Sequence, residues 1–174
     1  MTLIAWDARF ELGVPKMDST HQEFVQMLNA LGNASDDDLL RAFDALGAHT
    51  VEHFGQEDRW MAESGFGAMC HPSEHMNVLE VFRLVRERLL GGDFPLARKL
   101  ARELVPWFEN HAATMDTILV GHMAHVGYDP DNPQAFVAAA AQAEAAATGH
   151  GSPCDHGDGS ACVHEHPSAC GGLS

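Results

Sequence analysis

Positively charged residues are scarce in this chain. It carries 10 Lys and Arg against 25 Asp and Glu over 174 residues, which gives a formal net charge of −15. Because this balance repels a phosphate backbone and an anionic bilayer surface, we expect neither nucleic acid nor a membrane as a partner. Long apolar runs are also missing, since no stretch approaches the roughly 20 residues that a membrane-spanning helix needs. Residues 1–7 lack the basic and apolar segments of a secretory signal, so we expect a cytoplasmic protein.

Cysteine is rare in the part of the chain that has the pattern of a folded domain. Of the 4 cysteines, only Cys70 lies there, and the others occupy a Gly-rich C-terminal tail. This is not the framework of a disulfide-stabilised domain. With 45% hydrophobic residues, the chain is long enough for one domain with its own core. We expect this domain over residues 1–127, followed over 128–174 by a linker, a short Ala-rich helix at 135–147 and a disordered Cys/His-rich tail.

Apolar residues recur at helical spacing in four segments of the expected domain. The pattern is clear in the first segment, where Phe24, Met27, Leu28 and Leu31 follow the spacing i, i+3, i+4 and i+7. The expected helices begin near Asp18, Ser35, His71 and Pro95, and they end near Leu31, Gly65, Gly91 and Gly127. Short connections between helices of this length predict an all-α fold, an up-down-up-down four-helix bundle with an N-terminal extended arm over residues 1–17 and a disordered C-terminal tail.

Histidine is abundant, and several of the 12 histidines fall on the apolar sides of these helices. Two pairs have the spacing i, i+4, which places both side chains on one side of a helix, one turn apart. The candidate metal ligands, drawn from all four segments, are His21, His53, Glu57, His71, His75, His111 and Asp116. Because unpaired polar groups are costly at inward positions, a bound metal is the simplest explanation of this set.

The ligand types restrict the metal and its chemistry. Imidazole and carboxylate without thiolate favour iron, manganese or zinc, and seven ligands are too many for one tetrahedral zinc. Shared between two ions, they predict a bridged pair in which Glu57 and Asp116 are the natural bridges. Only two carboxylates neutralise such a pair, so highly oxidised iron would be stabilised less than in the four-carboxylate sites of ferritin-like oxidases. This favours reversible dioxygen binding over oxygen activation.

One spacing does not fit a regular helix. His111 and Asp116 are five residues apart, which is about 140° around an α-helix. Two ligands of one site fit better with a local π-helical turn, a feature common at functional sites. We therefore predict a π-turn near residues 110–116.

The motifs together resemble the bacteriohemerythrins of the hemerythrin family over residues 4 to about 122. The resemblance rests on Trp6-Asp7, Leu12-Gly13-Val14, Asp18-x-x-His21, His53-Phe54-x-x-Glu57, Met61, His71-x-x-x-His75, Trp107-x-x-x-His111 and Asp116. It implies a cofactor of two iron ions bridged by Glu57, Asp116 and an oxo or hydroxo group. One iron would take His71, His75 and His111, and the other would take His21 and His53 and keep a position open for dioxygen.

The resemblance implies reversible dioxygen binding at a non-haem di-iron centre, for storage or for delivery to oxygen-requiring enzymes. We expect a monomer that is not an enzyme, with no catalytic residue and no organic cofactor, because no acid, base or nucleophile accompanies the ligands. Two alternatives stay open. One is a sensor of oxygen, nitric oxide or redox state, and the other is a di-iron oxidase or peroxidase.

Departures from the family pattern flank two of the ligands. Thr20 precedes His21 where Gln or Glu is usual, and Phe108 and Ala112 lie near His111 where Leu and Ile are common. The small side chain of Ala112 predicts a roomier pocket over the open iron. The tail has soft and borderline ligands for zinc or copper, although their spacing matches no standard zinc finger. They are Cys154, His156, Cys162, His164, His166 and Cys170.

Overall fold

The computed structural model describes residues 2–67 and 70–148, and within these ranges the regular structure is helical throughout. A 3-10 turn η1 (Ala8–Phe10) precedes the helices α1 (Pro15–Asn33), α2 (Asp36–Ser64), α3 (Cys70–Leu90) and α4 (Phe94–His111). The π-helical turn η2 (Ala112–Asp116), α5 (Thr117–Val126) and α6 (Pro133–Thr148) complete the order. The predicted all-α fold is confirmed.

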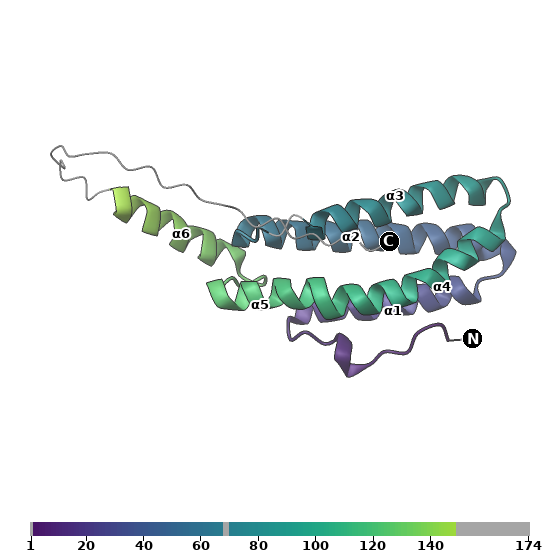
Figure 1. The fold of residues 1–174 in the computed structure, drawn as a ribbon, viewed down its shortest axis with the longest axis horizontal. Helices are drawn as coiled ribbons and strands as arrows, with labels where there is room; N and C mark the ends of the chain where they lie inside the picture. Colours follow the sequence, from purple (N-terminus) through teal and green to yellow (C-terminus); the bar gives the residue numbers. More distant parts are fainter. Residues whose placement is uncertain (1, 68–69, 149–174) are drawn as a thin grey trace, which may run out of the picture.

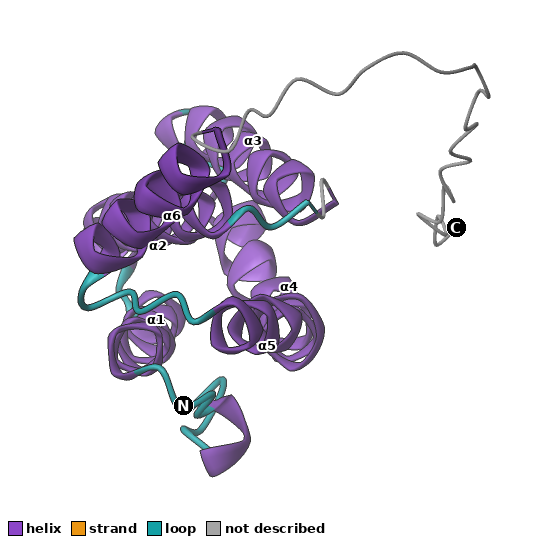
Figure 2. Cartoon of the chain, turned by 90° about the vertical axis from the view of Figure 1, so that its left-hand side faces the viewer, coloured by secondary structure: helices purple, strands orange, loops and turns teal. Residues whose placement is uncertain are grey.

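The long helices form a closed bundle. Figure 1 shows α1, α2 and α3 side by side with one rod made of α4, η2 and α5. Each long helix packs on the next along the chain, and α1 also packs on α4, which closes the ring seen end-on in Figure 2. Short connections, such as Ala34-Ser35 between α1 and α2, make neighbouring helices antiparallel.

The start of α2 and the ends of α2 and α5 lie where the sequence predicted them, and local interactions explain their positions. The Ser35 side chain accepts a hydrogen bond from the Asp38 amide, and three Asp in the first turn match the positive end of the helix dipole. Gly65 and Gly127 adopt φ values of 73° and 75°, a left-handed conformation that glycine takes without the steric cost of a side chain.

The predicted start of α1 was wrong by about one turn. The helix begins at Pro15, whose fixed φ suits a first helical turn. The Asp18 side chain does not cap this helix. Its two carboxylate oxygens accept hydrogen bonds from the amides of Leu12 and Gly13, at 2.7 and 3.1 Å, and so fix the end of the N-terminal arm.

The N-terminal arm is tied along α1, and it is extended apart from the turn η1. The Asn29 side chain accepts hydrogen bonds from the amides of Leu3 and Ile4 and donates one to the Ile4 carbonyl. Phe10 is buried, and its ring lies 5.2 Å from that of Phe108 on α4. The arm therefore covers the side of the bundle formed by α1 and α4.

The apolar core has two parts on either side of a polar layer. The larger part is here called the large cluster. It consists of Ile4 and Phe10 of the arm, Ala112 of η2, and from the long helices Phe24, Val25, Leu28, Leu31, Leu39, Phe43, Leu46, Phe82, Val85, Leu89, Ala97, Ala101, Leu104 and Phe108. The small cluster at the other end of the bundle consists of Met17, Trp60, Met61, Leu119, Met123 and Tyr128. On α1, α2 and the α4–α5 rod, the predicted ligands fall between the two clusters.

The Ala-rich helix predicted at 135–147 is present as α6, which projects beyond the bundle (Figure 1). Its Phe136 ring packs edge-on against Tyr128, with ring centroids 5.3 Å apart. The predicted disorder of the tail and its six candidate ligands lie outside the described residues. None of the helices described is both long enough and apolar enough to cross a bilayer.

Candidate metal centre

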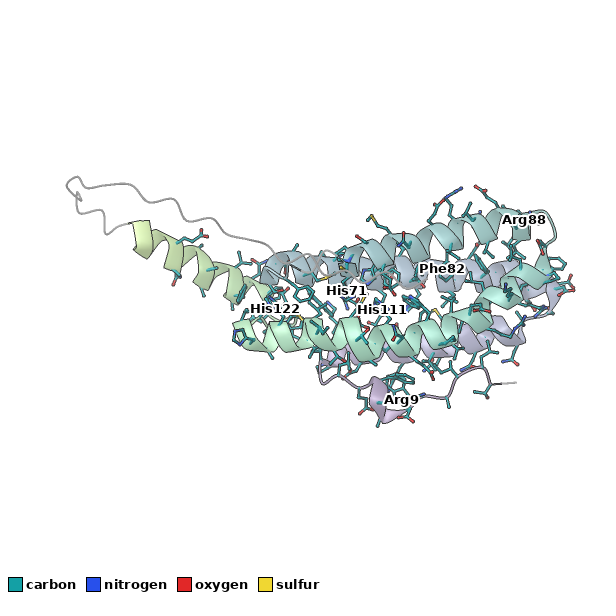
Figure 3. The ribbon with its side chains drawn as sticks, viewed as in Figure 1. Arg9, His71, Phe82, Arg88, His111 and His122 are labelled. Atoms are coloured by element: carbon teal, nitrogen blue, oxygen red, sulfur yellow. The ribbon has the colours of Figure 1, made fainter. Side chains whose placement is uncertain are left out.

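The seven predicted ligands come together in the middle of the bundle. Figure 3 shows His71 on α3 and His111 at the end of α4 directed into the interior between these elements. The others are His21 on α1, His53 and Glu57 on α2, His75 on α3 and Asp116 at the end of η2. All seven are buried, with exposed fractions between 0 and 4%.

The donor atoms form two groups that share one carboxylate. In the first group, donor atoms of Glu57, His71, His75 and His111 lie within 4.8 Å of one another; in the second group, those of His21, His53 and Glu57 do. The Nε2 atom of His111 lies 3.2 Å from that of His71 and 3.3 Å from that of His75. Three ring nitrogens therefore converge on one point.

Each carboxylate faces both groups. Glu57 Oε1 lies 2.5 Å from His53 Nε2, whereas its Oε2 lies 3.2 Å from His75 Nε2. Asp116 Oδ2 lies 3.3 Å from His21 Nε2, whereas its Oδ1 lies 3.2 Å from the Nε2 atoms of both His71 and His111. This is the arrangement that bridging carboxylates require, with one oxygen for each of two ions.

The predicted π-turn is confirmed, and it explains how Asp116 reaches the site. The turn η2 covers Ala112–Asp116 and lies within one continuous rod. A wider turn takes up the extra residue between His111 and Asp116, so both side chains point inward although a regular α-helix would separate them by about 140°. Thr117 Oγ1 donates a hydrogen bond to the Ala112 carbonyl, which satisfies a backbone acceptor within the turn.

The buried donor set fits metal ions better than it fits hydrogen bonding alone. Among the described residues, Glu57 Oε2, both Asp116 carboxylate oxygens and His21 Nε2 are buried without a well-formed hydrogen bond. Such groups destabilise a fold unless a cation or donor compensates them. Imidazole nitrogens and carboxylate oxygens are ligands that divalent iron accepts.

The carboxylates and imidazoles control one another's charge. Burial alone would raise the pKa of Glu57, but the adjoining His53, His71 and His75 hold that pKa well below its usual range. Burial and the charge of Glu57 likewise act to raise the pKa of Asp116, but the nearby imidazoles of His111, His21 and His71 outweigh them and lower it. Both carboxylates are therefore anionic near neutral pH.

Aromatic rings surround the imidazoles. Phe54 stacks on His75 with ring centroids 4.0 Å apart, and Trp107 stacks on His111 at 4.7 Å. The edge of the Phe108 ring meets His21 at 5.3 Å. These contacts hold the imidazole planes in place.

Two carboxylates outside the predicted set also contact ligand imidazoles. Asp58 Oδ1 accepts a hydrogen bond from His75 Nδ1 at 2.9 Å, and Glu74 Oε1 lies 3.7 Å from His111 Nδ1. Neither residue lies at an inward periodic position, so the helical spacing does not predict them as site residues. Their only sequence signal is that each stands directly beside a predicted ligand, Asp58 after Glu57 and Glu74 before His75.

Comparison with known proteins agrees with this geometry. The family model described as "Hemerythrin HHE cation binding domain" matches residues 12–123. A bacteriohemerythrin of Ralstonia nicotianae is 40% identical over 130 residues, covering 74% of this chain and 95% of that protein. A bacteriohemerythrin of Stenotrophomonas maltophilia is 30% identical over 121 residues, covering 64% of this chain and 75% of that protein.

Proposed function

We propose that this chain, which belongs to the hemerythrin family, holds two iron ions in its buried centre and binds dioxygen there reversibly, for storage or delivery. The observation that carries the proposal is the position of the two carboxylates. Glu57 and Asp116 each direct one oxygen toward one histidine group and the other oxygen toward the other group. A single ion would not use this arrangement.

The donor atoms divide unequally between the two ions. His71, His75 and His111 would hold one ion, and His21 and His53 would hold the other, with Glu57 and Asp116 between them. The ion held by His21 and His53 would have fewer protein ligands, so this side of the centre would leave a position open for dioxygen. The iron ions supply the electrons for this binding, whereas the protein supplies the fixed ligand geometry.

The surroundings of the centre support reversible binding. Phe108 meets the ring of His21 and is 1% exposed, and Ala112 is fully buried one residue after His111. Buried apolar side chains beside the centre would limit the access of water and protons to bound dioxygen and so slow its irreversible reduction.

The test is a visible spectrum of the anaerobically reduced, iron-loaded protein as dioxygen is admitted and then removed. We expect two irons per chain and an absorption band that appears with dioxygen and disappears when it is removed. Immediate and permanent conversion to the spectrum of ferric iron would overturn the proposal and favour a sensor or an oxidase.

A further inference from the structure

The outer ring nitrogens of the ligand histidines have unequal partners. Metal-binding imidazoles that coordinate through Nε2 leave Nδ1 free to donate a hydrogen bond outward. In the three-histidine group, His75 Nδ1 donates to the Asp58 carboxylate at 2.9 Å, and His111 Nδ1, which has no hydrogen bond, lies 3.7 Å from Glu74 Oε1. The separation between His111 Nδ1 and Glu74 Oε1 is too long for a hydrogen bond, but the negative charge of Glu74 still acts on the His111 imidazole. The third outer nitrogen, His71 Nδ1, is buried without a hydrogen-bond partner.

The two-histidine group has no comparable outer anion. His21 Nδ1 faces the Phe10 backbone carbonyl at 3.4 Å, and His53 Nδ1 is buried without a hydrogen-bond partner. Within the described part of the chain, the carboxylates paired with these two imidazoles are Glu57 and Asp116, which serve both groups. The extra negative charge is therefore confined to one end of the centre.

Glu74 is held in place by a second contact. The Trp107 indole Nε1 donates a hydrogen bond of 2.8 Å to the same Glu74 oxygen, and the Trp107 ring stacks on His111. Asp58 is fixed by its position on α2, next to Glu57. Since both contacts depend on buried imidazoles, solvent screens the two charges only in part.

We propose that Asp58 and Glu74 are positioning residues that strengthen the three-histidine end of the centre. An anion against Nδ1 makes the imidazole a stronger electron donor at Nε2, which tightens metal binding and favours the ferric state. The ion held by His71, His75 and His111 is then bound more tightly and oxidised more easily than the ion held by His21 and His53. This inference rests on the proposed two-iron centre, but it does not depend on dioxygen binding.

The experiment compares Asp58→Asn and Glu74→Gln with the wild type, without dioxygen. Both changes keep side-chain size and remove one charge. The control is Glu23→Gln, which removes a carboxylate from His49, a histidine outside the ligand set, where Glu23 Oε2 lies 3.6 Å from His49 Nδ1. Asp58→Glu serves as the conservative rescue, because it restores the anion.

The first readout is the release of metal to a competing chelator. Removing an outer partner of a metal-binding histidine typically weakens binding by about 10- to 100-fold. Asp58 and Glu74 are 44% and 29% exposed in their side chains, so we expect a change near the lower limit. One of the two ions should leave about tenfold more readily in the charge-neutral variants, with the other unchanged.

The second readout is the ratio of ferric to ferrous iron at a fixed electrode potential. We expect this ratio to fall about tenfold for one ion in Asp58→Asn, which corresponds to about 59 mV for one electron. Asp58→Glu and Glu23→Gln should retain the wild-type ratio. Equal loss of both ions, or variants that match Glu23→Gln in both readouts, would overturn the inference. Failure of dioxygen to bind reversibly to the wild type would instead overturn the proposed function alone.

Discussion

Loading the centre with metal should release protons, and the number released should depend on pH in a defined way. Burial alone would lower the pKa of His71, but the nearby carboxylates of Asp116 and Glu57 outweigh burial and raise the pKa to about 9. The metal-free protein therefore holds a proton on His71 at pH 7.5. A metal ion needs the neutral imidazole, so it must displace that proton.

The size of the effect follows from these groups. One displaced proton makes apparent metal affinity rise about tenfold per pH unit, and the rise stops where the group is already neutral. His71 supplies such a slope up to about pH 9, and His21 adds to it, because Asp116 and Glu57 outweigh burial and raise its pKa as well. We expect at least one proton per chain near pH 7.5 and fewer at pH 9.5.

The same proton affects the stability of the metal-free protein. The folded pKa of His71 lies above the value of 6.5 for a free imidazole. Its protonated form therefore stabilises the folded metal-free chain most below about pH 6.5, and this stabilisation is lost as the pH rises through about 9. Protons therefore compete with the metal ion for His71 most strongly at acid pH.

Calorimetry measures the proton count directly, using zinc as an ion without redox chemistry. Titrations at pH 7.5 in two buffers of different ionisation enthalpy give the protons released per chain, and repeats at pH 9.5 provide the internal control. Zero release at pH 7.5, or equal release at both pH values, would refute the assigned protonation of the metal-free centre.

Three further predictions concern packing and helix ends. Ala112→Ile should slow irreversible oxidation of the dioxygen-bound protein, because Ala112 is fully buried and the larger side chain would fill the space that its small side chain is predicted to leave. If the visible band decays at the same rate in the variant and in the wild type, this reasoning is wrong. Ser35→Ala should lower the free energy of unfolding by about 1 kcal/mol in urea, because the Asp38 amide loses its cap. Tyr128→Phe should cost about 1 kcal/mol, seen as a lower Tm, because the phenol donates a 2.5 Å hydrogen bond to Glu63; an unchanged Tm would show that this bond contributes nothing.

The helices could be predicted because local and global signals agree. Apolar spacing, the Ser35 cap and the glycines at positions 65 and 127 all indicate the boundaries that the structure has. The start of α1 was wrong because Asp18 has two chemically reasonable roles, as a helix cap or as an acceptor for the arm. Only the folded arm decides between them, since Leu12 and Gly13 offer amides that lack other partners nearby.

The inward positions of the seven candidate ligands and the π-turn could be predicted for a similar reason, since both depend on spacing along single helices. The contacts between helices could not. Which oxygen of Asp116 faces His21 depends on the relative placement of α1 and η2. The contact of Glu74 with His111 depends on the Trp107 indole, which lies 33 residues away in the chain. Side-chain directions set by neighbouring helices leave no periodic trace in the sequence.

The position of the centre explains why the bundle tolerates so many buried polar groups. The polar layer separates the large cluster from the small cluster. The imidazoles and carboxylates of this layer therefore make much of the contact between the two ends of the bundle. Such a layer destabilises a fold when its charges are incompletely paired. Apolar side chains of similar volume in its place would give an equal or greater free energy of unfolding. Yet α1, α2, α3 and the α4–α5 rod all place candidate ligands at this one level, and the rod does so through an irregular turn. Because metal binding to preformed ligands contributes directly to folding free energy, two bound ions would offset the cost of the layer and join the two clusters into one core.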